Sequence, residues 1–179
     1  MAITKVTSAL LNSTALTSKA FGTSSIMIGD DATGTIDAAN YNVGLGVDVF
    51  AALTTGDNNV AVGFDALTSN TTGIGNVAVG YQALDAHTTG NNNVAIGNEA
   101  LSANTTASNN VGVGVVALRL NTTGTDNVAV GAYALDANTT GNDNTAFGDN
   151  ALGANTTASN NTAVGSSALL VNTLQEHKT

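Results

Sequence analysis

Residues 59–75 are NVAVGFDALTSNTTGIG, and residues 76–92 repeat the pattern as NVAVGYQALDAHTTGNN. The four-residue unit that ends in glycine, Val60 to Gly63 in the first segment, recurs nine times along the chain. Every interval is 17 residues, without an insertion or a deletion. A repeat of constant length is typical of a protein that stacks one structural unit many times. This repeat therefore decides the fold.

Each repeat has the local chemistry of a β-strand joined to turns. The alternation of β-branched residues in Val-x-Val suits a pleated strand, and Asn-Thr-Thr-Gly suits a turn. Helical solenoid repeats need about 33 residues or more, so 17 residues leave room for only two short strands and two turns. We therefore predict an all-β protein, a parallel β-solenoid (β-roll) of nine coils over residues 26–178, preceded by a separate segment over residues 1–25.

Stacked coils place equivalent side chains in columns. We expect the columns of Val60, Val62 and Leu67 to form the core, and the asparagine column of Asn59 to bridge amides from coil to coil, as in cross-β structures. The glycine that closes each unit is expected where the chain needs a positive φ or where the next coil comes close. These glycines are Gly29, Gly46, Gly63, Gly80, Gly97, Gly114, Gly131, Gly148 and Gly165.

The alanine between the two valines is expected to face outward, against another subunit. About three large apolar side chains in each coil form a thin core for 17 ordered residues, and a strip of small residues suits close contact with a flat surface. We therefore predict a homotrimer, which closes around an axis. Its seam would be formed by Ala61, Ala78, Ala95, Ala129, Ala146 and Ala163.

Both ends of the chain depart from the repeat. The last coil carries extra apolar residues that are expected to cap the open end of the solenoid: Leu169, Leu170, Val171 and Leu174. Residues 1–25 contain two lysines and no acid, and we expect them to attach the solenoid to another protein. The alternative is that they only cap the first coil. The attachment residues would be Lys5, Leu10, Leu11, Lys19 and Phe21.

Composition and charge exclude several partners. The formal net charge is −9 and only 9% of the residues are charged, so the acidic body would repel nucleic acid and anionic membrane surfaces. The apolar runs are too short for membrane insertion. The chain contains no cysteine, which excludes disulfides and thiolate metal sites.

Candidate catalytic and metal-binding residues are sparse. The acids Asp65, Asp85, Asp136 and Asp149 do not form an acid–base pair, because the two that share a repeat position lie three coils apart. His87 has no second ligand in register, and the turns lack the glycine-rich nonapeptide of calcium-binding rolls. We therefore expect no enzyme activity, no catalytic residue, no metal and no cofactor.

Two polar features have more than one interpretation. Pairs such as Thr71-Thr72 stack as in ice-binding β-solenoids, but neighbouring strand residues point to opposite faces, so only one of each pair could join an outward row. We favour a turn and keep ice binding as a minor alternative. Asn-x-Thr sequons arise from the repeat, and glycosylation is the weaker interpretation. They begin at Asn70, Asn104, Asn121, Asn138 and Asn155.

The repeats resemble those in the head domains of trimeric autotransporter adhesins, which form left-handed parallel β-rolls assembled as trimers. Asn-Val-Ala-Val-Gly and the segment Asn93 to Gly97 carry this resemblance. The form with Ala-Leu and Asn-Thr-Thr-Gly is similar to stretches in fibre and appendage proteins of tailed bacteriophages. The resemblance covers residues 26–174.

The resemblance also implies a function. The sequence shows no secretion signal, coiled-coil stalk or membrane barrel, all of which an autotransporter adhesin needs. We therefore expect a virion structural protein of a tailed bacteriophage: a trimeric spike, fibre or head decoration at the virion surface. It would bind other virion proteins through residues 1–25 and contact a host-surface glycan or protein. A fragment of a bacterial trimeric surface adhesin is the alternative.

Overall fold

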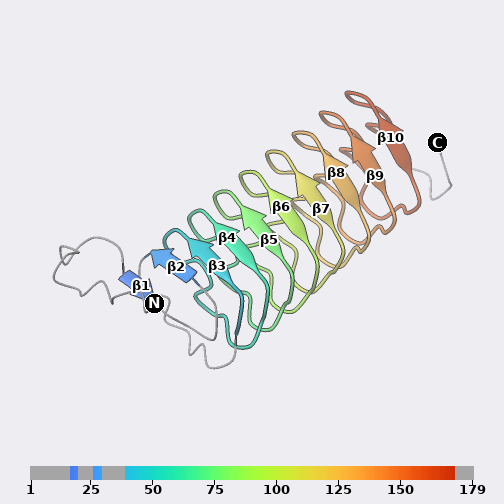
Figure 1. Cartoon of the computed structure of the whole chain (residues 1–179). Helices are drawn as coiled ribbons and strands as arrows, with labels where there is room; N and C mark the ends of the chain where they lie inside the picture. Colours follow the sequence, from blue (N-terminus) through green and yellow to red (C-terminus); the bar gives the residue numbers. More distant parts are fainter. Residues whose placement is uncertain (1–16, 20–25, 30–38, 172–179) are drawn as a thin grey trace.

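A computed structural model describes residues 17–19, 26–29 and 39–171. Within these residues the protein is all-β, with ten short strands in one sheet and no helix (Figure 1). The strands are β1 (Thr17–Lys19), β2 (Ile26–Gly29), β3 (Val43–Leu45), β4 (Val60–Val62), β5 (Val77–Val79), β6 (Val94–Ile96), β7 (Val111–Val113), β8 (Val128–Val130), β9 (Thr145–Phe147) and β10 (Thr162–Val164).

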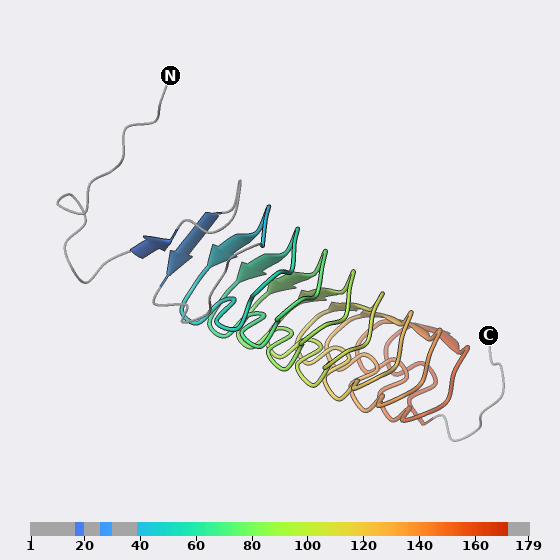
Figure 2. The same ribbon diagram turned by 90° about the horizontal axis from the view of Figure 1, so that it is seen from below.

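The strands follow one another in chain order, and every neighbouring pair from β2 to β10 is parallel. The register is 17 residues throughout, so Val77 pairs with Val60 on one side and with Val94 on the other. The coils stack along one axis (Figure 2). The predicted parallel β-solenoid is confirmed. The count of nine coils stays a prediction, because residues 30–38 and 172–178 lie outside the described residues.

Each described coil holds one three-residue strand, where the sequence predicts two. The segment opposite the strand is built from turns, because Gln82 and Leu84 have φ values of 51° and 52°, a left-handed conformation that interrupts an extended strand. Hydrogen bonds between coils nevertheless continue there. The Leu84 N–H donates to the Ala100 carbonyl (3.1 Å), and the Ala86 N–H donates to the Ser102 carbonyl (3.2 Å). The backbone is therefore satisfied without a second strand.

The interior consists of an alanine column from the strands packed against a leucine column from the opposite segment. Ala78 and Leu84 are fully buried, and so are most of their equivalents. The space between the columns is narrow, because a Cβ added at Gly112, in the alanine column, would lie 3.3 Å from the Cγ of Leu101. Opposite a leucine, therefore, only a methyl group or a hydrogen atom fits.

The predicted alanine seam is consequently wrong. Its residues are buried inside their own chain and offer no surface to another subunit: Ala61, Ala78, Ala95, Ala129, Ala146 and Ala163. Since neighbouring strand residues point to opposite faces, the valines on either side of each alanine face outward, not inward. The size limit that suggested a subunit contact comes from the solenoid's own core.

The glycine after each strand is required by the stack. Gly97 has a φ of 140°, and an added Cβ would overlap the carbonyl oxygen of Gly114 in the next coil. Both expected reasons for this glycine are thereby confirmed, and they hold equally at Gly46, Gly63, Gly80, Gly114, Gly131 and Gly148. Gly165 also has a positive φ, of 122°, but the nearest atom to an added Cβ is the Cβ of Ala168 at 3.9 Å. Gly29 is the last residue of β2.

The two ends of the sheet differ. At the N-terminal end β1 pairs with β2 in the antiparallel direction, with Thr17 opposite Gly29 and Lys19 opposite Met27. The other predicted attachment residues, Lys5, Leu10, Leu11 and Phe21, lie outside the described residues.

At the C-terminal end the predicted cap stays a prediction. Leu169 packs against the core, whereas Leu170 and Val171 are 38% and 71% exposed in the single chain. Leu174 lies outside the described residues.

Candidate interaction surfaces

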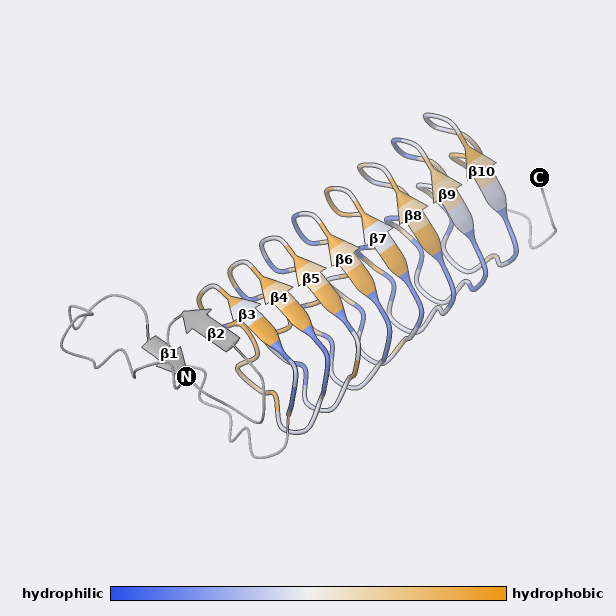
Figure 3. Ribbon diagram, viewed as in Figure 1, coloured by the Kyte–Doolittle hydropathy of each residue, from blue (hydrophilic) through white to orange (hydrophobic). Residues whose placement is uncertain are grey.

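The outward residues of the strands form a continuous apolar surface, which we call the outer sheet face. Its residues are partly or largely exposed in the single chain, and Figure 3 shows the strands from β3 to β8 as strongly hydrophobic. None of its side chains is charged. It consists of Val43, Leu45, Val60, Val62, Val77, Val79, Val94, Ile96, Val111, Val113, Val128, Val130, Thr145, Phe147, Thr162 and Val164.

A flanking column two residues beyond each strand extends this face at its N-terminal end. Val47, Phe64 and Tyr81 are exposed, and the rings of Phe64 and Tyr81 stack with centroids 5.6 Å apart and planes 11° apart. Toward the C-terminus the same column becomes more polar and ends in Asp149 and Ser166. The surface is therefore most apolar near β3 to β5 and more polar near β9 and β10.

A buried asparagine ladder runs beside the strands, as the sequence predicts. The Asn93 backbone N–H donates to the Oδ1 of Asn76 at 2.9 Å, and the Asn93 Nδ2 donates to the same oxygen at 3.1 Å. The Nδ2 also donates to the Ala107 carbonyl at 2.9 Å. The ladder thus joins successive coils through both backbone and side chain. Its members are Asn42, Asn59, Asn76, Asn93, Asn110, Asn127, Asn144 and Asn161, all fully buried.

A second buried ladder was not predicted from the sequence, which assigned its asparagines to turns without a direction for their side chains. The Asn70 Oδ1 accepts from the Gly73 N–H at 3.0 Å, and its Nδ2 donates to the Gly73 carbonyl at 3.1 Å. The side chain closes the turn from inside, which is why it is buried. The same asparagines begin the sequons, so their amides face away from any glycosylating enzyme: Asn70, Asn104, Asn121, Asn138 and Asn155.

His87 occupies one position of this second ladder. It is fully buried, and its Nε2 donates to the Gly90 carbonyl at 2.8 Å. Its Nδ1 has no hydrogen-bond partner within the described part of the chain. Burial lowers the pKa of His87, although the hydrogen bond to Gly90 opposes this shift. The folded chain therefore favours the neutral ring.

The paired threonines form two columns at the surface. In most pairs the first threonine joins coils: the Thr71 Oγ1 donates to the Thr88 carbonyl and the Thr88 Oγ1 to the Thr105 carbonyl, both at 2.9 Å. The second threonine is exposed, and Thr105 and Thr106 are both exposed. The expectation that only one of each pair could point outward is wrong here, because these residues lie in a turn and not in a strand.

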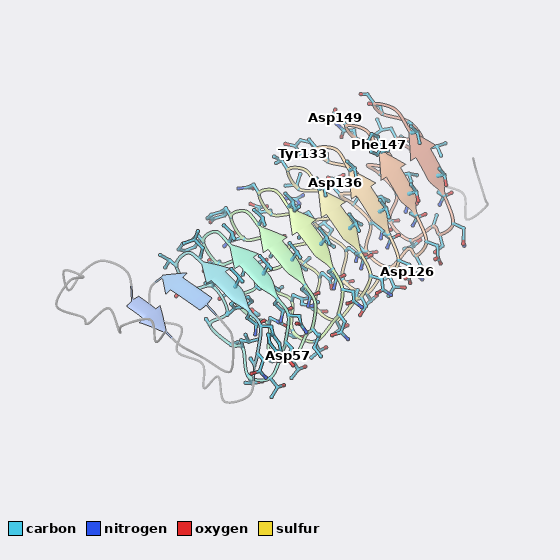
Figure 4. The ribbon with its side chains drawn as sticks, in the orientation of Figure 1. Asp57, Asp126, Tyr133, Asp136, Phe147 and Asp149 are labelled. Atoms are coloured by element: carbon cyan, nitrogen blue, oxygen red, sulfur yellow. The ribbon has the colours of Figure 1, made fainter. Side chains whose placement is uncertain are left out.

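The titratable groups are dispersed. Burial raises the pKa of Asp85 and of Asp136, which lie three coils apart. Asp57 and Asp126 lie along one edge, while Asp136 and Asp149 lie toward the other (Figure 4). Arg119 Nη1 is 4.0 Å from Glu99 Oε2.

Among the described residues, no three His, Cys, Asp or Glu side chains gather as metal ligands, and no helix is long and apolar enough to cross a membrane.

These features define a parallel β-solenoid repeat protein with one charge-free apolar face. Comparison with protein-family models, curated proteins and solved structures finds no match to this chain.

Proposed function

We propose that the chain is a non-enzymatic structural protein of a tailed bacteriophage, a homotrimeric spike, fibre or head decoration at the virion surface. The observation that carries this proposal is the uninterrupted stack from β2 to β10, which holds one register over all its coils. Backbone, asparagine and threonine hydrogen bonds join each coil to the next. The stack is straight and elongated (Figures 1 and 2), which is the shape of a projecting shaft.

The partners follow from the same arrangement. Residues 1–25 would hold the shaft to other virion proteins, and the exposed turns along its length would meet a host-surface glycan or protein. The resemblance of the repeats to fibre and appendage sequences of tailed bacteriophages supports this role. A shaft of this kind needs no cofactor.

Two other functions remain open to test. A fragment of a bacterial trimeric autotransporter-type adhesin would use the same stack at a cell surface. Ice binding is the minor alternative, and the observation that favours it is the exposed second threonine in every described pair, from Thr55 to Thr157. Thermal hysteresis in a freezing assay would support ice binding, and its absence would remove it.

Localisation tests the proposal directly. Antibodies against residues 39–171 should label purified phage particles in immunogold electron microscopy, and mass spectrometry of the same particles should detect the chain. Labelling of the bacterial envelope instead would favour the adhesin. A chain found in neither fraction would overturn both assignments.

A further inference from the structure

The outer sheet face leaves the solenoid with a surface that a single chain does not cover. The eight strands from β3 to β10, spaced about 4.8 Å apart, make a strip roughly 38 Å long and 10 Å wide, about 380 Å² in area. This is comparable with the largest apolar patches on monomeric proteins, which often mark interaction sites. The column of this face that contains Val62 has eight members. Seven of them are aliphatic, and the eighth is Phe147, which is 57% exposed.

We propose that the outer sheet face is the contact between copies of this chain, and that the copies run parallel and in register. This inference rests on the assembly part of the proposed function and names the surface that mediates it. The partner is a second copy, because a straight apolar strip with a 17-residue repeat is matched over its whole length by the same strip on another chain.

Charge singles out this face. The formal net charge of the chain is −9, so two copies repel each other through most surfaces. The opposite sides carry acids such as Asp57, Asp126 and Asp136, and contact there would bring like charges together. The outer sheet face has no charge to desolvate. It is therefore the surface on which copies of an acidic chain can approach closely.

The gradient along the face sets the direction of the copies. An antiparallel pair with full overlap would place the coil of Phe64 against that of Asp149, and would bury a carboxylate beside an aromatic ring. When the copies run parallel around a common axis, the side of the face that carries the flanking column contacts the other side of the face on the neighbouring copy. The two contacting residues then belong to the same coil. Asp149 then lies level with Thr145, and Phe64 lies level with Val60.

Solution mass and a matched pair of variants test the surface. The wild-type chain should have about three times the 17.6 kDa of one chain in light scattering. Val79→Glu, in the middle of the apolar part, should reduce this mass to that of one chain. Circular dichroism should show that the variant is still folded. Thr89→Glu adds the same charge to an exposed residue of the same coil on another side, and it should leave the mass unchanged. A wild-type monomer, or equal effects of the two variants, would overturn the inference.

Single cysteines test the direction and do not depend on how Val79→Glu folds, because the natural chain has none. Val62→Cys and Phe147→Cys lie five coils apart, about 24 Å along the axis. Copies that are parallel and in register should form disulfide-linked or bis-maleimide-linked dimers in each variant alone. Linkage only in a mixture of the two variants would show an antiparallel pair.

The same linkage assay separates this inference from the proposed function. No linkage in the two single variants or in their mixture would overturn the assigned surface. The chain could then still be found in virions, so the two failures are distinguishable.

Discussion

At the scale of the residue, Gly97 shows how the stack dictates one side chain. Its φ of 140° and the overlapping carbonyl of Gly114 exclude any Cβ without movement of the next coil. We expect Gly97→Val to lower the free energy of unfolding by more than about 2 kcal/mol. Asn98→Val is the matched control, because Val115 fills the equivalent exposed position one coil later. Urea denaturation monitored by circular dichroism should separate the two, and equal midpoints would contradict the assignment.

Gly165 refines this prediction. It shares the positive φ, yet an added Cβ there would meet only the Cβ of Ala168 at 3.9 Å. Gly165→Val should therefore destabilise the chain less than Gly97→Val does, since it adds backbone strain without a steric overlap. The difference in unfolding free energy between the two variants measures the clash with the next coil.

His87 makes stability depend on pH. Its pKa is lowered in the folded chain from 6.5, so the unfolded chain binds more protons, and stability falls as the pH drops below about 6.5. We expect His87→Asn to remove this acid-side loss. It should also stabilise the chain by about 1 kcal/mol at neutral pH, because an asparagine there would accept from the Gly90 N–H as Asn70 accepts from Gly73.

Thermal melts at pH 7.5 and pH 5.5 test this, and Asn104→His should create a similar dependence in the next coil. The raised pKa values of Asp85 and Asp136 act in the opposite direction, because the folded chain then binds more protons and stability falls as the pH rises above 3.8. Acid sensitivity that is identical in wild type and His87→Asn would contradict the role of the buried imidazole.

At the scale of the element, the sequence predicts the register but not which side of the strand faces inward. Spacing fixes that Val60 pairs with Val77, and it fixes the columns of glycine and asparagine. Period-two alternation says that Ala61 and Val60 face opposite ways, without saying which is inside. Apolar content favours valine inside, whereas the leucine column leaves room only for alanine. The available signal was the column itself, because every member from Gly44 to Ala163 is alanine or glycine.

The second buried ladder was hidden for a related reason. Asn-Thr-Thr-Gly has the composition of a surface turn, and composition does not reveal that the Asn70 side chain points into the coil. The left-handed Leu84 was equally unpredictable, because leucine has no intrinsic preference for a positive φ. Its conformation is imposed by packing between coils.

Ala95 provides a test of the corrected interior. Ala95→Leu should overpack the space beside the leucine column and destabilise the chain by about 1–3 kcal/mol, whether or not the chain associates. Ala103→Leu is the matched control, since Leu120 occupies the equivalent position in the next coil. The midpoint of chemical denaturation should therefore fall for Ala95→Leu and stay unchanged for Ala103→Leu. A stable Ala95→Leu variant with a reduced mass in solution would restore the alanine seam.

At the scale of the whole molecule, each coil is stabilised by its neighbours, so the ends determine where unfolding begins. The described N-terminal end carries the antiparallel strand β1 on the edge of β2, whereas β10 is the last strand at the other described end. An edge strand presents unpaired N–H and C=O groups. β1 therefore covers the edge of β2 with three residues only. Their hydrogen bonds are a small part of those in the whole stack.

Deletion of residues 1–24 separates attachment from capping. The variant loses β1 but keeps every coil from β3 to β10, so we expect it to associate like the wild type and to melt within a few degrees of it. It should nevertheless fail to join particles when added to a lysate of a phage mutant that lacks the protein, because the lysines and apolar residues of this segment would no longer meet the particle. The full-length chain, added in parallel, should restore incorporation. If the deletion instead lowers the melting temperature strongly in isolation, the segment acts through the edge of β2, and attachment must reside in another part of the shaft.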